Sequence, residues 1–141
     1  MSDLHNVIES LNDAQMKMIL DKIGLIYEEI GTDVYMVCLS DSDSKFNVVL
    51  VNMHDTLLLS APFNDDISAN SISSWNTNYP FAKSYFQQDG SVSLGASHYL
   101  RGGVTVLNVV KFLGQFHSEL KTFAQVFKIY LPMILFVFFS L

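Results

Sequence analysis

Three short β-prone segments follow one another between residues 34 and 61, and only brief polar turns separate them. The segments cover residues 34–39, 46–51 and 56–61, with turns at 40–44 and 52–55. Parallel strands need a crossover of a dozen or more residues, whereas antiparallel neighbours can be joined by loops as short as these. The region therefore predicts a three-stranded antiparallel meander.

Three amphipathic segments surround the predicted strands and indicate helices. Apolar residues recur in them at helical spacing. Asn12 or Asp13 can cap the first helix, and Gly24 follows it at a typical C-cap position. Thr105 can cap the last helix after a Gly-Gly break. The predicted helices cover residues 11–23, 67–77 and 106–127.

A second pair of strands is predicted between the short helix and the last one. Residues 81–87 and 91–99 flank Asp89-Gly90, a dipeptide that favours hairpin turns, and Pro80 prevents the preceding helix from continuing. The order is α-β-β-β-α-β-β-α. We therefore expect an α+β fold in which helices flank an antiparallel five-stranded sheet, formed by residues 1–128 as a single domain.

Residues Ile129–Leu141, IYLPMILFVFFSL, form an apolar tail without charge, and eleven of its thirteen residues are apolar. As a helix the tail would span about 20 Å, against a hydrocarbon core of ~30 Å, so it is too short to cross a bilayer alone. Three interpretations stay open. The tail packs on the domain or in an oligomer interface, it dips into one leaflet, or it does not belong to the ancestral domain.

The charge distribution bears on the class of partner. The net charge is −6, and thirteen of the fourteen acidic residues precede residue 90. Phosphate binding needs clustered Lys and Arg, so we expect no nucleic acid partner. Cys38 is the only cysteine, and no apolar signal segment opens the sequence. The prediction is a cytoplasmic protein without a disulfide, with membrane association through residues 129–141 as an open alternative.

The sequence shows no recognisable catalytic or metal-binding pattern. The four histidines, at positions 5, 54, 98 and 117, are separated from one another and have no cysteine at ligand spacing. The sequence contains neither a Gly-x-Ser-x-Gly elbow nor a phosphate-binding loop. We therefore predict a chain that is not an enzyme and has no catalytic residue, no cofactor and no bound metal.

One set of apolar residues is a candidate surface for a partner or for dimerisation. Four of them alternate along two predicted strands, and the fifth is the only tryptophan; the same residues could equally be core. The set comprises Phe46, Val48, Leu57, Leu59 and Trp75. Beside the tryptophan, Asn76 is predicted to hydrogen-bond strand backbone and hold the short helix against the sheet.

The chain resembles the YbjN family of bacterial proteins over about residues 11–127. The resemblance implies a fold like that of the type III secretion chaperones, with a twisted antiparallel sheet flanked by helices, often as a dimer. It also implies an interaction domain without catalytic activity, and the family's label of sensory transduction regulator names no activity. The segments that carry the resemblance are residues 11–27, 74–76, 80–86, 89–90 and 102–105.

Two functions from different classes are compatible with these observations. The first is a binding or chaperone-like module, regulatory in role, that holds another protein or a second copy of itself. The second is a membrane-associated regulator anchored by Ile129–Leu141. The identity of a partner does not follow from the sequence.

Overall fold

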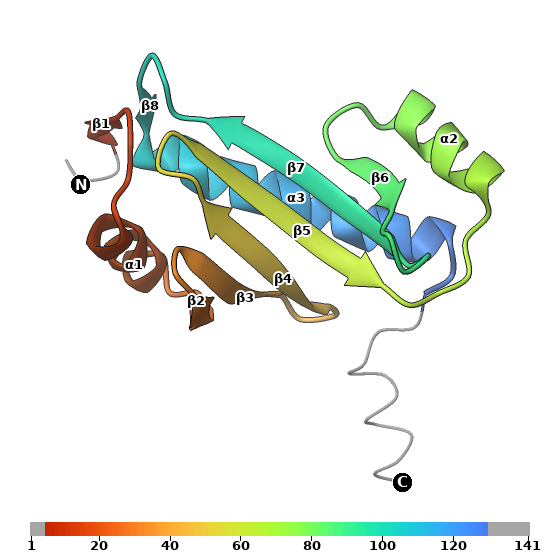
Figure 1. The fold of residues 1–141 in the computed structure, drawn as a ribbon. Helices are drawn as coiled ribbons and strands as arrows, with labels where there is room; N and C mark the ends of the chain where they lie inside the picture. The colour runs from red at the N-terminus through yellow and green to blue at the C-terminus, as the bar shows by residue number, and fades with distance from the viewer. Residues whose placement is uncertain (1–4, 130–141) are drawn as a thin grey trace, which may run out of the picture.

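Six antiparallel strands form one sheet in the order β2-β3-β4-β5-β7-β6 in the computed structural model, which describes residues 5–129 (Figure 1). The expectation of five strands was therefore wrong by one, whereas the α+β class and the antiparallel pairing are confirmed. A separate two-stranded sheet pairs β1 (Val7–Ile8) with β8 (Val104–Thr105). The main strands are β2 Ile26–Gly31, β3 Val34–Ser40, β4 Lys45–Asn52, β5 Thr56–Phe63, β6 Lys83–Phe86 and β7 Val92–Tyr99.

The sixth strand is β2, at one edge of the sheet. Its sequence, IYEEIG, carries two adjacent acids and no apolar alternation, and five of its six residues are exposed. An edge strand pairs on one side only, and here its side chains bury little, so the pattern that marks a half-buried strand is missing. The pairing register with β3 also shifts between Glu29 and Gly31, which marks a bulge or irregularity.

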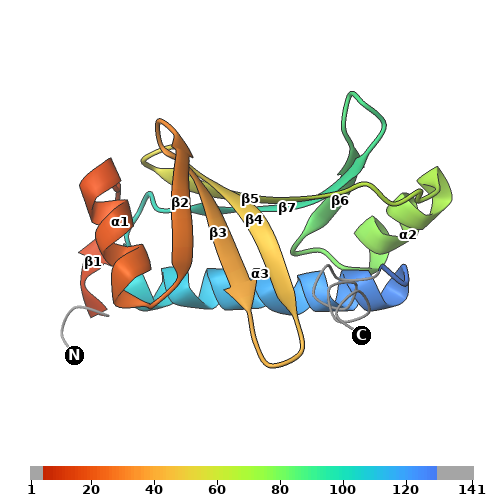
Figure 2. The ribbon, with the colours of Figure 1, turned by 90° about the horizontal axis from the view of Figure 1, so that it is seen from below.

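Three helices lie on one side of this sheet. They are α1 (Asp13–Lys22), α2 (Ala69–Asn78) and α3 (Val106–Val126). Both predicted long helices begin where expected: Asn12 and Thr105 are their N-caps, and each forms a reciprocal capping box. Figure 2 shows α3 running beneath the sheet, with α1 and α2 near its two ends.

The core lies between α3 and one face of the sheet. Phe116, Leu120 and Phe123 of α3 are fully buried. The residues predicted as a candidate partner surface belong to this core, which is the alternative that the sequence left open. Their exposed fractions are 6% for Phe46, 0% for Val48, 1% for Leu57, 2% for Leu59 and 2% for Trp75. All five are therefore core residues in the described chain.

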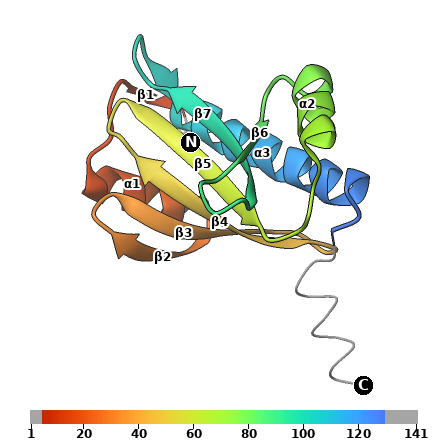
Figure 3. The same cartoon turned by 45° about the vertical axis from the view of Figure 1, so that its right-hand side comes forward.

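The short helix α2 is attached to the edge strand β6, beside which it lies in Figure 3. The side-chain amide of Asn76 donates to the carbonyl oxygen of Ser84 at 2.9 Å and accepts from its backbone N–H at 2.8 Å. These bonds confirm the structural role predicted for Asn76. Trp75 adds a third bond, from its ring nitrogen to the carbonyl oxygen of Ala82 at 3.0 Å. Asn76 thus bonds to the edge of β6 that faces away from β7, much as another strand would.

Replacing Asn76 by alanine is expected to destabilise the fold by about 2 kcal/mol, because a nearly buried backbone N–H and C=O lose their partners. Urea unfolding should show a lower midpoint with an unchanged slope. Asn78→Ala is the matched control, since the Asn78 side chain makes only a local bond to Ser74 on the exposed side of the same helix. Equal decreases in the free energy of unfolding of Asn76→Ala and Asn78→Ala would contradict the role assigned to Asn76.

Candidate binding surface

The sheet face turned away from α3 has no described helix over it (Figure 1, where α3 lies behind the strands). We call it the outer face. Strand pairing aligns its side chains in cross-strand rows, one running Met36, Val49, Ser60 and another running Val34, Val51, Leu58. The rows continue onto β7 at Gly95 and Ser97. The centre of the outer face is therefore apolar on β3 and β4 and becomes small and polar towards β7.

Charged side chains occupy only the rim of the outer face. Register places Glu28 on it from the edge strand β2, Lys45 at the end of β4, and Lys83 from the other edge strand, β6. The outward positions between them carry no charge. An uncharged apolar centre within a polar rim is the anatomy of protein–protein interfaces.

Two tyrosines border the β7 side of the outer face. The Tyr85 ring lies over Gly95, where an added Cβ would come within 3.2 Å of a ring carbon, and its hydroxyl is 3.4 Å from that of Ser60. Tyr85 keeps 41% of its surface exposed, and Tyr99 keeps 71%. Tyrosine is enriched at interfaces because it combines a large apolar ring with a polar tip.

The two edges of the sheet differ in their availability. At β6, the backbone groups of Ser84 are already bonded to Asn76. At β2, no other strand pairs with the outward edge within the described residues. There Ile26 is 76% exposed, but two acids and the register shift disfavour regular strand addition.

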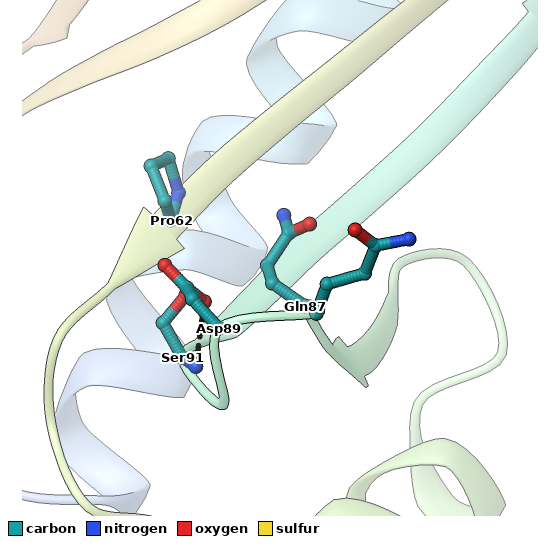
Figure 4. Close-up of a pocket in the computed structure, with 5 residues that line it drawn as sticks. Pro62, Gln87, Asp89 and Ser91 are labelled. Atoms are coloured by element: carbon teal, nitrogen blue, oxygen red, sulfur yellow. Dashed lines mark hydrogen bonds between the residues drawn. The ribbon is translucent and has the colours of Figure 1, made fainter.

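A pocket of about 440 Å³ lies at the far end of the outer face, between Pro62 of β5 and the β6–β7 turn (Figure 4). Of the described residues that line it, Asp89 alone is ionisable, and its carboxylate accepts bonds from the backbone N–H of Ser91 at 2.9 Å and from the Ser91 hydroxyl at 2.6 Å. These bonds hold the pKa of Asp89 below its ordinary value. The carboxylate is engaged within the turn, and none of the described lining residues is a base or a cation, so we assign no chemistry to this pocket.

A serine, a histidine and three charged side chains meet where the β3–β4 turn contacts α3, a grouping that the sequence did not reveal. The Ser44 hydroxyl donates to Asp41 at 2.7 Å and lies 2.9 Å from Nε2 of His117. Lys121 forms ion pairs with Asp41 at 2.8 Å and with Asp43 at 3.1 Å. Residues separated by about seventy positions come together only through the packing of the turn on the helix.

This cluster is arranged as a structural clamp. In a catalytic triad histidine stands between serine and aspartate and removes the serine proton. Here serine stands in the middle, donates to Asp41 and therefore accepts from the neutral ring of His117, whose pKa is lowered chiefly by burial. Ser44 is also only 2% exposed. The arrangement therefore ties the turn to α3.

Within residues 5–129, no three His, Cys, Asp or Glu side chains come close enough together to hold a metal ion. Over the same residues, no helix is both long enough and apolar enough to cross a bilayer. The interpretations of the apolar tail concern Ile129–Leu141, of which all but Ile129 lie outside the described part of the chain.

Comparison with known proteins decides the family. The model of the YbjN family, described as "Putative bacterial sensory transduction regulator", matches residues 12–128. The chain belongs to the YbjN family. No curated protein matches it. The YbjN resemblance predicted from the sequence is thereby confirmed, with nearly the same boundaries.

A solved YbjN structure shares the fold. It is described as "Crystal structure of YbjN, a putative transcription regulator from E. coli", and it is 20% identical in sequence with a TM-score of 0.68. The match covers 89% of this chain and 99% of that one. At this identity the YbjN structure supports the architecture alone, and the likeness to type III secretion chaperones stays a prediction.

Replacing Asp41 by asparagine is expected to lower the free energy of unfolding at pH 7. Lys121, then Ser44 and Asp43, hold the pKa of folded Asp41 below its ordinary value of 3.8. The resulting stabilisation is complete above the pKa of the unfolded state and is lost as the pH falls towards the folded-state pKa. The difference between wild type and Asp41→Asn should therefore shrink below about pH 5.

Urea unfolding of both proteins between about pH 2 and pH 7 measures this difference. Asp65→Asn is the control, because Asp65 is an exposed carboxylate in the loop between β5 and α2, away from the cluster. If the difference in free energy of unfolding between wild type and Asp41→Asn grows as the pH falls, the role assigned to this cluster is wrong.

Proposed function

We propose that this YbjN-family chain is a non-enzymatic regulatory module that binds another protein, or a second copy of itself, through the outer face of its sheet. The observation that carries the proposal is the uncharged, apolar centre of that face, which no described helix covers. Four of the five residues predicted from the sequence, all but Trp75 of α2, lie on strands of this sheet but on its buried face. The strands were identified correctly, and the proposed surface uses the alternate residues.

The free energy for such binding comes from covering half-buried apolar side chains. Burial of apolar surface contributes roughly 25 cal/mol per Å², so covering about 200 Å² on the outer face would contribute roughly 5 kcal/mol before the entropy of association. Met36, Val49 and Leu58 lie in adjacent strands near the middle of the face. Tyr85 and the charged side chains of the rim would then fix the orientation of the bound partner.

The charge distribution supports a protein partner over nucleic acid. Lys17, Lys121 and Arg101 each form ion pairs with neighbouring carboxylates at 2.7 to 3.1 Å. Cations engaged in this way form no open basic surface, which phosphate binding requires. We therefore propose that a regulatory role is exerted through protein contacts. Because Cys38 is the only cysteine and nothing signals an oxidising compartment, we further propose a cytoplasmic location.

A charge placed on the outer face beside its apolar centre should weaken binding without disturbing the fold. Asn47→Glu and Ser97→Glu are suitable because both side chains are exposed and their strand positions point outward. Full-length baits are used to capture partners from a native lysate of the organism that encodes the chain. We expect at least a tenfold loss of any specific partner with each variant, equivalent to 1.4 kcal/mol or more.

The matched control is Ser118→Glu, which places the same charge on the exposed side of α3, away from the outer face. It should retain the partner at the wild-type level. Light scattering of the purified proteins distinguishes self-association from binding of another protein. Equal recovery by all four baits, together with a monomeric wild type, would reject the outer face as the binding surface.

A further inference from the structure

One cross-strand row of the outer face ends in a charged side chain on each edge of the sheet. The pairing registers connect one residue from each of the six strands into this row. In the order of the strands, its members are Glu28, Met36, Val49, Ser60, Gly95 and Lys83. Within the described residues, neither Glu28 nor Lys83 forms an ion pair. The ammonium of Lys83 donates only a long bond, of 3.4 Å, to the carbonyl oxygen of Asn76.

The two halves of this row are opposite in charge and in side-chain size. The half on β2, β3 and β4 carries the acid and two apolar side chains, whereas the half on β5, β7 and β6 carries a serine, a glycine and the base. Six strands spaced by about 4.8 Å place the first and the last about 24 Å apart, so Glu28 and Lys83 of one copy cannot reach each other. The row is therefore complementary to itself when it is turned end for end.

We propose that the outer face binds the outer face of a second copy of this chain, across a two-fold axis that lies between β4 and β5 and runs parallel to the strands. This rotation turns the row end for end, so that Glu28 of each copy faces Lys83 of the other. Stacked sheets lie about 10 Å apart, a gap that a glutamate and a lysine bridge by extending from opposite sides. The inference rests on the proposed function, because it names the occupant of the outer face.

The same rotation also matches the uncharged side chains. It places Met36 of each copy opposite Gly95 of the other, where the Tyr85 ring lies over the glycine. The long thioether thus meets a residue without a side chain and an aromatic ring, which is a favourable contact for sulfur. In the next row, Ile26 of β2 comes opposite Tyr85 of β6. Contact there covers Ile26, which is 76% exposed in the single chain.

The outer face is large enough for such a dimer. The strands β3, β4, β5 and β7 have seven or eight residues each. Strands of that length extend about 25 Å, and with a width of about 24 Å the face measures roughly 600 Å². The two copies together then cover roughly 1,200 Å², the lower end of the range for specific interfaces. A two-fold contact uses the same surface on both copies, so association closes at the dimer.

The test is the dimer dissociation constant of the full-length protein, measured by sedimentation equilibrium. Glu28→Lys and Lys83→Glu should each weaken the dimer roughly tenfold or more, because like charges then face each other at both ends of the row. The double variant Glu28→Lys/Lys83→Glu exchanges the charges in both copies, so it should return to within about threefold of wild type. An equal mixture of the two single variants should form a heterodimer that is tighter than either homodimer.

Glu9→Lys and Lys111→Glu are matched controls, since they make the same charge changes at exposed positions in the loop between β1 and α1 and on α3. Both should leave the dissociation constant unchanged, and thermal unfolding checks that each variant is folded. A wild type that is monomeric at every soluble concentration overturns the proposal, and so does a dimer that the double variant does not restore. In either case, a lysate partner that the wild type captures and Asn47→Glu loses would leave the outer face standing as a surface for another protein.

Discussion

Packing of α3 against one face of the sheet is the interaction on which the remaining architecture depends. A helix with its side chains is about 10–12 Å wide, whereas six strands spaced by about 4.8 Å span roughly 24 Å. One helix therefore cannot cover the face alone. The other two helices lie near the ends of the sheet (Figure 2). There α1 bonds to β3 and β2 through Asp13–Tyr35 and Lys17–Glu29, and α2 bonds to β6 through Asn76. All three described helices thus lie on the same side of the sheet.

This distribution of helices gives the outer face its character. An antiparallel sheet with one face in solvent usually alternates apolar and polar residues. Here Val48, Val49, Leu50 and Val51 are consecutive in β4, as are Leu57, Leu58 and Leu59 in β5. Continuous apolar runs are typical of strands covered on both faces. One face is covered by α3, so the runs are the sequence signal that the opposite face is also apolar.

The elements that could be predicted are those whose signal is local. Capping residues such as Thr105, the Asp89-Gly90 turn and the helical stripes depend on near neighbours in the chain. Even the bond from Asn76 to a strand was predictable, because α2 and β6 are separated by only a short loop. The edge strand β2 and the Asp41–Ser44–His117 cluster are different, since distant elements determine them. The choice of buried face for Phe46 and Leu57 also depends on where α3 packs, which no window of sequence contains.

The edges of the sheet limit how this YbjN-family protein can associate. Asn76 occupies the backbone groups of Ser84 on β6, and acids with a shift of register interrupt β2. Strand addition depends on free backbone groups and is therefore tolerant of partner sequence. Side chains in fixed cross-strand rows, such as Met36, Val49 and Ser60, instead require a partner of matching shape. An arrangement that restricts the edges and leaves the outer face uncovered thus favours contacts made by side chains over strand addition, and contacts of that kind discriminate better between partners.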